Sequence, residues 1–258
     1  METKLNIVGV IPARYASTRL PAKPLVDLCG KPMVQRVVDQ ARQAKLLSRV
    51  VVATDDNRIA EVLSRNGAEF VMTPQEIRTG SDRIAFVARQ MHDADIIVNI
   101  QGDEPLIDPA IIDDAIRPML NDSRILVATL VKKIVSPDEL HNPNIVKAIL
   151  DQDGFAVYFS RSAIPYLRDG AEMNRWHLQH DYYKHLGLYV FRRGILLEFA
   201  SWEESALERM EKLEQLRFIE HGIKIKATVT GTDSVPVDTA EDVERVKGIL
   251  MQQVAAHG

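Results

Sequence analysis

Three cations gather in one proline-containing segment near the start of the chain. Residues 12–26 read PARYASTRLPAKPLV and contain Arg14, Arg19 and Lys23 but no acidic residue. The whole chain of 258 residues has a formal net charge of −4, so this concentration of positive charge is local. A loop stiffened by proline loses little ordering entropy when a ligand arrives, and its cations suit phosphate groups. We therefore interpret 12–26 as a phosphate-binding segment. The alternative is a solvated loop whose cations pair with distant acids.

The segment lacks the two best-known phosphate-binding fingerprints. It contains neither the G-x-x-x-x-G-K-[ST] pattern of P-loop NTPases nor the G-x-G-x-x-G pattern of dinucleotide-binding proteins. A P-loop enzyme is thereby excluded, and the oxidoreductase class is disfavoured.

Two aspartates are candidates to face these cations. Asp103 stands in QGDEP, directly after an apolar run, and Gly102 beside it permits a close backbone approach or an unusual backbone angle. Asp238 stands in SVPVDTAEDV, where Thr239 can already cap the helix that follows. Each aspartate alone could simply form a salt bridge or favour a helix N-terminus. Together with the cationic segment they predict a metal–triphosphate site, because Mg²⁺ prefers one or two carboxylates plus phosphate oxygens.

The elements that must position these residues follow from hydrophobic patterning. Continuous rather than alternating apolar runs predict strands covered on both faces, as in parallel sheets. Helix-period stretches separate the runs, so we expect an α/β fold with a doubly wound, mostly parallel sheet. In such sheets ligands bind at the carboxyl ends of the strands, which would bring 12–26 and Asp103 to one edge. The four runs are 6–11, 49–54, 69–73 and 96–100.

The alternation of apolar runs with helix-period stretches ends after about residue 121. Several apolar runs with few helices between them predict a mixed or antiparallel section. One amphipathic helix is expected over 210–222, closed by Gly222, and a terminal helix is expected to begin with Thr239 at its N-cap. The polar stretch 167–184 is expected to be a mobile loop. We expect a single domain over 1–258, with an inserted smaller lobe at approximately 155–215.

Composition limits which partners and which cellular compartment are expected for the protein. With 46% hydrophobic and 26% charged residues, the chain has the make-up of a globular protein, and its acidic balance disfavours nucleic acid as a partner. No apolar run approaches the roughly 20 residues of a membrane span, and 5–11 is too short for a signal core. Cys29 is the single cysteine and is expected to be a small core residue. We expect a cytoplasmic protein without membrane contact.

Several motifs taken together carry a family resemblance. They run in order from the first strand to the last helix and cover essentially the whole chain. The chain resembles the CMP-KDO synthetases, the 3-deoxy-manno-octulosonate (KDO) cytidylyltransferases. The opening motif is shared more loosely among sugar nucleotidyltransferases, whereas QGDEP, YFSR, HLGLY and EQLR are typical of the KDO branch. The motifs are IPARYASTRLPAKPL, VATDD, TGSDR, NIQGDEP, YFSRSAIP, KHLGLYVFRR, LEQLR and VDTAEDVERV.

The resemblance implies transfer of CMP from CTP to KDO, with release of pyrophosphate, for lipopolysaccharide biosynthesis. It implies that the sheet is a Rossmann-like nucleotidyltransferase sheet and that the single domain over 1–258 is a nucleotidyltransferase domain. It also implies Mg²⁺ as cofactor and a homodimer, with the inserted lobe at approximately 155–215 serving sugar binding or dimerisation. The implied catalytic set is Arg14, Lys23, Asp103 and Asp238, with the two aspartates holding the metal. The implied nucleotide-binding residues are Pro12, Ala13, Arg14, Lys23, Ser81, Arg83 and Gln101. The implied KDO-binding residues are Arg161, His185, Tyr189, Glu214 and Gln215.

One residue departs from the family pattern, and rival functions remain. The family's loop usually reads RLPGKPL, and here Ala22 replaces the glycine. If that position needs a positive φ, alanine costs on the order of 1 kcal/mol.

The same reaction on 8-amino-KDO or sialic acid is the nearest alternative. A glycosyltransferase would need a D-x-D pair that QGDEP does not supply, and a nucleotide-sensing module would bind CTP without turnover. Outside the resemblance, His185 would be taken for a structural histidine.

Overall fold

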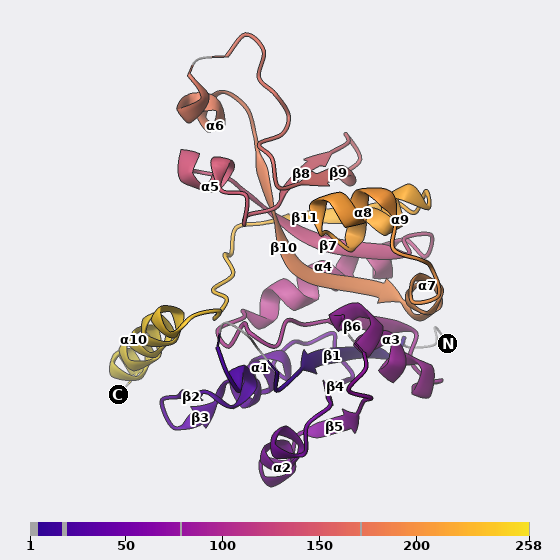
Figure 1. Ribbon diagram of the computed structural model, residues 1–258, viewed down its shortest axis with the longest axis vertical. Coiled ribbons are helices and arrows are strands. Elements are labelled where there is room, and N and C mark those ends of the chain that lie inside the picture. The colour runs from indigo at the N-terminus through magenta and orange to yellow at the C-terminus, as the bar shows by residue number, and fades with distance from the viewer. Residues whose placement is uncertain (1–4, 17–19, 78, 171, 258) are drawn as a thin grey trace. The chain divides into compact units, whose positions relative to one another are not determined.

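The computed structural model describes residues 5–16, 20–77, 79–170 and 172–257 (Figure 1). The chain divides into two compact units, which are described separately. The first unit comprises Met1–Asp113 with Ser234–Gly258, and the second comprises Asp114–Asp233. The lobe expected at approximately 155–215 falls within the second unit.

Four parallel strands form the sheet of the first unit, in the order β5-β4-β1-β6 (Figure 1). The predicted runs are confirmed as strands, and the side chains of β1 and β6 are almost wholly buried because both faces are covered. The chain moves outward from β1 to β4 and β5, then returns to the other side of β1 as β6. This reversal creates a switch point between the carboxyl ends of β1 and β6, where open α/β sheets bind ligands. The strands are β1 (Ile7–Ala13), β4 (Arg49–Thr54), β5 (Glu69–Met72) and β6 (Ile96–Asn99).

Two helices in the first unit carry terminal residues of the kinds that favour helix ends. Gly67 follows α2 with φ of 64°, the left-handed conformation that glycine adopts readily after a helix C-terminus. Thr239 and Asp242 cap α10 reciprocally: the Asp242 N–H donates to Thr239 Oγ1 at 3.2 Å, and the Thr239 N–H donates to Asp242 Oδ2 at 3.0 Å. The helices are α1 (Met33–Ala41), α2 (Asn57–Arg65), α3 (Gly80–Gln90) and α10 (Ala240–His257).

A short hairpin follows the cationic segment. The 3₁₀ helix η1 (Lys23–Leu25) leads into β2 (Asp27–Leu28) and β3 (Lys31–Pro32). Cys29 and Gly30 form the turn between them, with φ of 53° and 82°, the left-handed pair that a tight two-residue hairpin requires. The expectation that Cys29 is a core residue is therefore wrong: it lies exposed at the tip of the turn.

Five strands in the second unit pair in a mixed pattern, in the order β10-β7-β11-β9-β8, and β8 also pairs with β10. β10 is antiparallel to β7, whereas β11 is parallel to it. The predicted mixed section is confirmed, and a parallel arrangement throughout is found only in the first unit. The strands are β7 (Val127–Lys133), β8 (Lys147–Leu150), β9 (Phe155–Ser160), β10 (Tyr183–Arg192) and β11 (Ile225–Thr230).

The single helix expected over 210–222 is wrong, because two helices replace it. Lys212 adopts a left-handed conformation with φ of 54° and ends α8, and α9 begins three residues later. The expected mobile stretch holds η2 and α6, and Trp176 at the start of α6 is only 3% exposed, packed among Ile134, Leu140 and Tyr182. The remaining helices are α4 (Pro109–Asn121), α5 (Pro137–His141), η2 (Met173–Arg175), α6 (Trp176–Gln179), α7 (Arg193–Phe199), α8 (Ala206–Glu211) and α9 (Gln215–Glu220). Among the described residues, no helix combines the length and apolarity that crossing a membrane requires.

Candidate active site

A cavity of about 370 Å³ opens at the carboxyl ends of β1 and β6 in the first unit. It lies at the switch point, and seven of the residues implied by the family resemblance line it together. Segments that are 135 residues apart in the sequence, from Asp103 to Asp238, therefore meet around one space. The lining residues are Pro12, Ala13, Arg14, Ala16, Lys23, Pro24, Gln101, Gly102, Asp103 and Asp238.

Lys23 lies between the two aspartates that the sequence singled out. Its Nζ atom is 2.6 Å from Asp103 Oδ2 and 2.9 Å from Asp238 Oδ1, so one ammonium donates to both carboxylates. The side chain of Lys23 is 14% exposed, and those of Asp103 and Asp238 are 30% and 34% exposed. Carboxylates that share one cation point at the same small volume, which is the arrangement that a divalent cation also needs.

The backbones around these aspartates are held closely together. A Cβ atom added to Gly102 would stand 2.5 Å from the carbonyl oxygen of Pro12, so the predicted close approach at this glycine is confirmed. The Val237 N–H donates to the carbonyl oxygen of Asp103 at 2.9 Å. The end of β6 is thus packed against the end of β1 on one side and bonded to the Asp238 segment on the other.

The backbone conformation of Ala22 directs Lys23 into this site. Ala22 has φ of 53° and ψ of 30°, a left-handed conformation that alanine seldom adopts. The Leu25 N–H donates to the Ala22 carbonyl at 2.8 Å and closes the tight turn of η1. The positive φ suspected from the departure at position 22 is confirmed.

The loop after β1 presents Arg14 outward and anchors Tyr15. Arg14 is exposed at the cavity, whereas Tyr15 is half-buried, with the guanidinium of Arg58 3.3 Å from its ring centroid. Arg58 in turn donates twice to Asp56, at 2.6 and 2.9 Å, and this pairing lowers the pKa of Asp56. A cation over an aromatic face is attractive, so the stack fixes one side of the loop. Arg19 lies outside the described residues.

Arg83 is buried rather than displayed to the cavity. Its side chain is 0% exposed and donates to Asp55 Oδ2 at 2.8 Å, to the Ile77 carbonyl at 3.0 Å and to Thr73 Oγ1. Burial lowers the pKa of Arg83, and the charge of Asp55 opposes that shift. In this structure Arg83 therefore holds the 73–77 segment, and Ser81 stands in the first turn of α3. Contact of either residue with a nucleotide remains a prediction.

In the second unit, His185 is a neutral hydrogen-bonding group. The Thr129 hydroxyl donates its proton to the Leu188 carbonyl at 2.7 Å. The Thr129 oxygen can therefore only accept from His185 Nε2, which lies 2.9 Å away, so Nε2 carries the ring proton. The other ring nitrogen of His185, Nδ1, is then an acceptor. Burial lowers the pKa of His185 to about 3. An irregularity in the β10–β7 pairing falls between Leu186 and Tyr189 and re-aims the strand at this point.

Tyr189 carries a polar atom without a partner. Its ring lies 5.0 Å from that of His185, and its hydroxyl is buried with no hydrogen-bond partner among the described residues. Burial raises the pKa of Tyr189, and the charge of Glu214 adds to this shift. A buried unsatisfied hydroxyl is costly, and a ligand hydroxyl or carboxylate could satisfy it.

Arg161 binds backbone carbonyls at the break between α8 and α9. Its side chain donates to the carbonyls of Glu211 at 2.7 Å and Pro143 at 3.0 Å, while its backbone N–H donates to Glu211 Oε2 at 3.0 Å. Glu214 and Gln215 follow directly as the N-cap and first residue of α9. Arg161 thus positions the segment carrying both residues, and its direct contact with a sugar remains a prediction.

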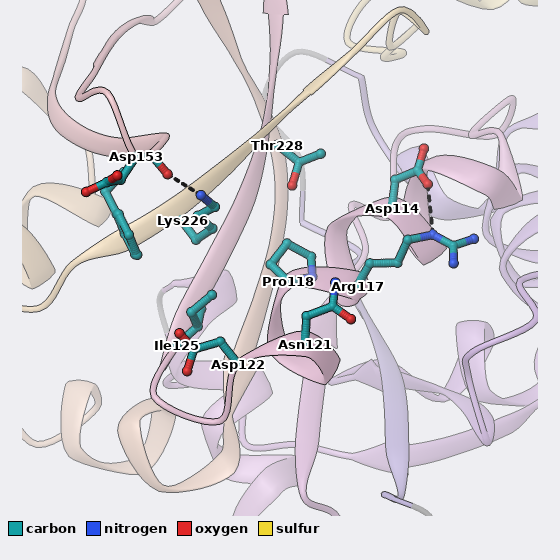
Figure 2. A pocket seen from close by; sticks show the side chains of 10 residues that line it. Asp114, Arg117, Pro118, Asn121, Asp122, Ile125, Asp153, Lys226 and Thr228 are labelled. Carbon is teal, nitrogen blue, oxygen red and sulfur yellow. Dashed lines mark hydrogen bonds and ion pairs between the residues drawn. The ribbon is translucent and has the colours of Figure 1, made fainter.

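The second unit also contains a cavity of about 500 Å³ between α4 and β11 that holds none of the implied residues (Figure 2). Within it Lys226 donates to the backbone carbonyl of Asp153, and Arg117 donates to Asp114 at 3.3 Å. We do not assign chemistry to this cavity.

Sequence reasoning missed the partners that fix these residues. Asp55 and Thr73, which bind Arg83, were given no role, although they follow β4 and β5 at the carboxyl edge of the sheet, where functional residues gather. Ala16 and Pro24 line the cavity through their positions in the loop. No feature of the sequence indicated that Glu211 meets Arg161.

Comparison with known proteins places the chain in a family. A family model described as cytidylyltransferase matches residues 8–225. The chain therefore belongs to the cytidylyltransferase family, consistent with a cationic loop and two carboxylates at the switch point of an α/β sheet. Its relatives give a more particular name. The proteins named 3-deoxy-manno-octulosonate cytidylyltransferase from Trichlorobacter lovleyi and Chloroherpeton thalassium are 47% and 46% identical to it. These matches cover 96% and 97% of this chain and 100% of each relative.

A solved structure agrees with these relatives. CMP:2-keto-3-deoxy-manno-octonic acid synthetase, complexed with CTP, matches with a TM-score of 0.90 and 39% identity, over 96% of this chain and 99% of that one. A cytidylyltransferase from Leptospira borgpetersenii, 21% identical with a TM-score of 0.63, shares the fold over 96% of this chain and 87% of its own.

Proposed function

We propose that this protein transfers CMP from CTP to the anomeric hydroxyl of KDO and releases pyrophosphate. The bond that forms joins the sugar oxygen to the α-phosphorus, and the bond that breaks joins the α-phosphorus to the oxygen bridging to the β-phosphate. The observation that carries the proposal is the convergence of Arg14, Lys23, Asp103 and Asp238 on one cavity, in a chain whose near-full-length relatives bear this activity in their names.

Charge is the main obstacle to this reaction. CTP brings about four negative charges and KDO one carboxylate, so two anions must approach one another. Arg14 is exposed at the cavity, and we propose that it binds the triphosphate, with Pro12, Ala13 and Gln101 lining the nucleotide position. Positioning and neutralisation of charge supply most of the catalysis in phosphoryl transfer.

Asp103 and Asp238 fit Mg²⁺. Their carboxylate oxygens already share one cation, Lys23 Nζ, at 2.6 and 2.9 Å. No group of three or more His, Cys, Asp or Glu able to hold a metal occurs among the described residues. A site of two carboxylates that leaves the remaining positions to phosphate and water is the kind that Mg²⁺ accepts. When bound there, the metal would neutralise phosphate charge and lower the pKa of a coordinated hydroxyl.

The second unit supplies groups suited to a sugar acid. We propose that His185 Nδ1 accepts from a sugar hydroxyl and that the Tyr189 hydroxyl finds its missing partner in the same ligand. Because the pKa of His185 is about 3, this residue contributes a neutral acceptor at physiological pH. Glu214 and Gln215, held by Arg161, complete the proposed set.

Three further properties belong to the proposal. Right-handed crossovers for the order β5-β4-β1-β6 would place α1 and α2 on one face and α3 on the other, a doubly wound sheet. We also propose a cytoplasmic homodimer joined through the second unit, and light scattering on the purified protein tests the dimer.

The reaction itself is tested with purified protein, CTP and Mg²⁺, by measuring pyrophosphate with each of KDO, 8-amino-KDO and sialic acid. We expect turnover with KDO that EDTA abolishes and added Mg²⁺ restores. Turnover that prefers sialic acid, or CTP binding without turnover on any of the three, would contradict the assignment.

A further inference from the structure

Lys23 occupies the position where a metal would be expected. Its ammonium lies between Asp103 and Asp238 in a half-buried setting, donating to an oxygen of each. Both hydrogen bonds are charge-assisted, the strong kind. Two carboxylates that converge on one point repel each other unless a cation lies between them, so the ammonium stabilises the site in the absence of ligand.

The side chain of Lys23 can leave this position while the backbones around it stay in place. Its own backbone is fixed between the left-handed Ala22 and the buried Pro24, and the Val26 N–H donates to the Lys23 carbonyl at 3.2 Å. The backbones of the aspartates are held as well, since the Val237 N–H donates to the Asp103 carbonyl and the Asp238 N–H donates to Asp242 Oδ2 at 3.0 Å. Four side-chain torsions of lysine can carry the ammonium to another partner in the cavity without moving either strand end.

We propose that Lys23 is an internal counterion that holds the metal position in the nucleotide-free protein and is exchanged for the divalent cation when CTP arrives. This inference rests on the proposed function, because it takes the two aspartates as the metal ligands. A divalent cation alone must displace the ammonium and leave it without a carboxylate partner. The triphosphate offers the displaced ammonium new acceptors in the same cavity, so nucleotide and metal assist each other's binding.

The exchange makes metal and nucleotide binding reciprocal. If CTP tightens metal binding by a given factor, the metal tightens CTP binding by the same factor, and such couplings commonly amount to about 5–150-fold. Without the ammonium of Lys23, the metal has no competitor for the two carboxylates. The part of the coupling between metal and CTP binding that depends on Lys23 is then lost.

The test measures Mn²⁺ binding to the nucleotide-free protein through the electron paramagnetic resonance signal of free Mn²⁺. We expect Lys23→Met to tighten binding about tenfold or more. Lys45→Met, which removes the same charge from an exposed site elsewhere in the first unit, should leave the affinity unchanged. Adding Asp103→Asn to Lys23→Met should abolish the gain, and thermal unfolding checks each variant. Lys23→Gln, which keeps a polar side chain, provides the same readout if Lys23→Met does not fold.

Two results would separate the exchange from the proposed function. If the wild type with CTP binds more Mn²⁺ than CTP chelates alone, and neither Lys23→Met nor Lys23→Gln gains affinity without CTP, the exchange is wrong while the metal assignment stands. If Asp103→Asn leaves this additional Mn²⁺ binding unchanged, the metal assignment fails and the exchange fails with it.

Discussion

Replacing Gly102 with alanine should separate the two strand ends that carry the site. The added Cβ would stand 2.5 Å from the Pro12 carbonyl oxygen, whereas real Cβ atoms essentially never approach closer than 3.0 Å. The backbones of β1 and β6 must therefore move apart by about 0.5 Å at this point, because a carbonyl cannot rotate aside as a side chain can. Arg14 and Asp103 lie within two residues of the contact and would move with it.

A displacement of this size is expected to be costly for catalysis. A misplacement of about 1 Å can lower the rate about a hundredfold, so we expect Gly102→Ala to lower kcat/KM by about ten- to a hundredfold. In free energy this is about 1.4–2.7 kcal/mol of transition-state stabilisation. The assay is pyrophosphate release at varied CTP with saturating KDO and Mg²⁺.

Gly80 offers a matched control in the same surroundings. A Cβ added there also meets Pro12, but at 3.8 Å from its Cγ atom, an ordinary van der Waals contact. Gly80→Ala should therefore keep wild-type kinetics. If Gly102→Ala retains wild-type kcat/KM, or if Gly80→Ala loses as much activity, the close approach of the two strand ends does not set the geometry of the site.

Three further predictions follow from positions described above. Ala22→Gly should raise the free energy of unfolding by about 1 kcal/mol, measured in urea, since glycine adopts φ of 53° without the steric cost that alanine has; no gain would show that the turn relaxes. Asp103→Asn should cut kcat by several decades and leave the circular dichroism spectrum unchanged, because a neutral amide is a much weaker ligand for Mg²⁺ than a carboxylate; near-normal turnover would remove Asp103 from the mechanism. The pKa of His185 is about 3 in the folded state and about 6.5 in the unfolded state. Between these pH values the unfolded chain protonates His185 and the folded chain does not, so the free energy of unfolding falls as the pH drops below about 6.5. The loss should reach up to about 2 kcal/mol at pH 5 and should be smaller in His185→Gln; equal slopes in both proteins would contradict this account.

Local patterns predicted the first unit well because each of its strands is a short, continuous apolar segment. β4 begins and ends at the residues expected, Arg49 and Thr54, since no competing turn signal lies within it. The cavity could be anticipated for the same reason: parallel strands bring their carboxyl ends to one edge, so residues after β1 and β6 must meet there.

Contacts between distant residues account for what the sequence did not predict. At the break between α8 and α9, Arg161 binds the carbonyl of Glu211, which is 50 residues away in the sequence. The hydrophobic periodicity of 210–222 carries no information about a contact with a distant residue, so it predicts one uninterrupted helix there. The sequence predicted that Asp238 faces the cations of 12–26. The structure adds that the cation paired with it is Lys23, 215 positions earlier.

Because Asp238 lies late in the sequence, the site can form only after residues 234–258 have been synthesised. Residues before 114 and after 233 together build the first unit, and its interior joins Leu28 and Met33 to Val237, Val246 and Leu250. A nascent chain whose residues 234–258 have not yet emerged from the ribosome has Asp103 but lacks Asp238, and part of that interior faces water. A product truncated before Ser234 should therefore be both inactive and a substrate for proteolysis.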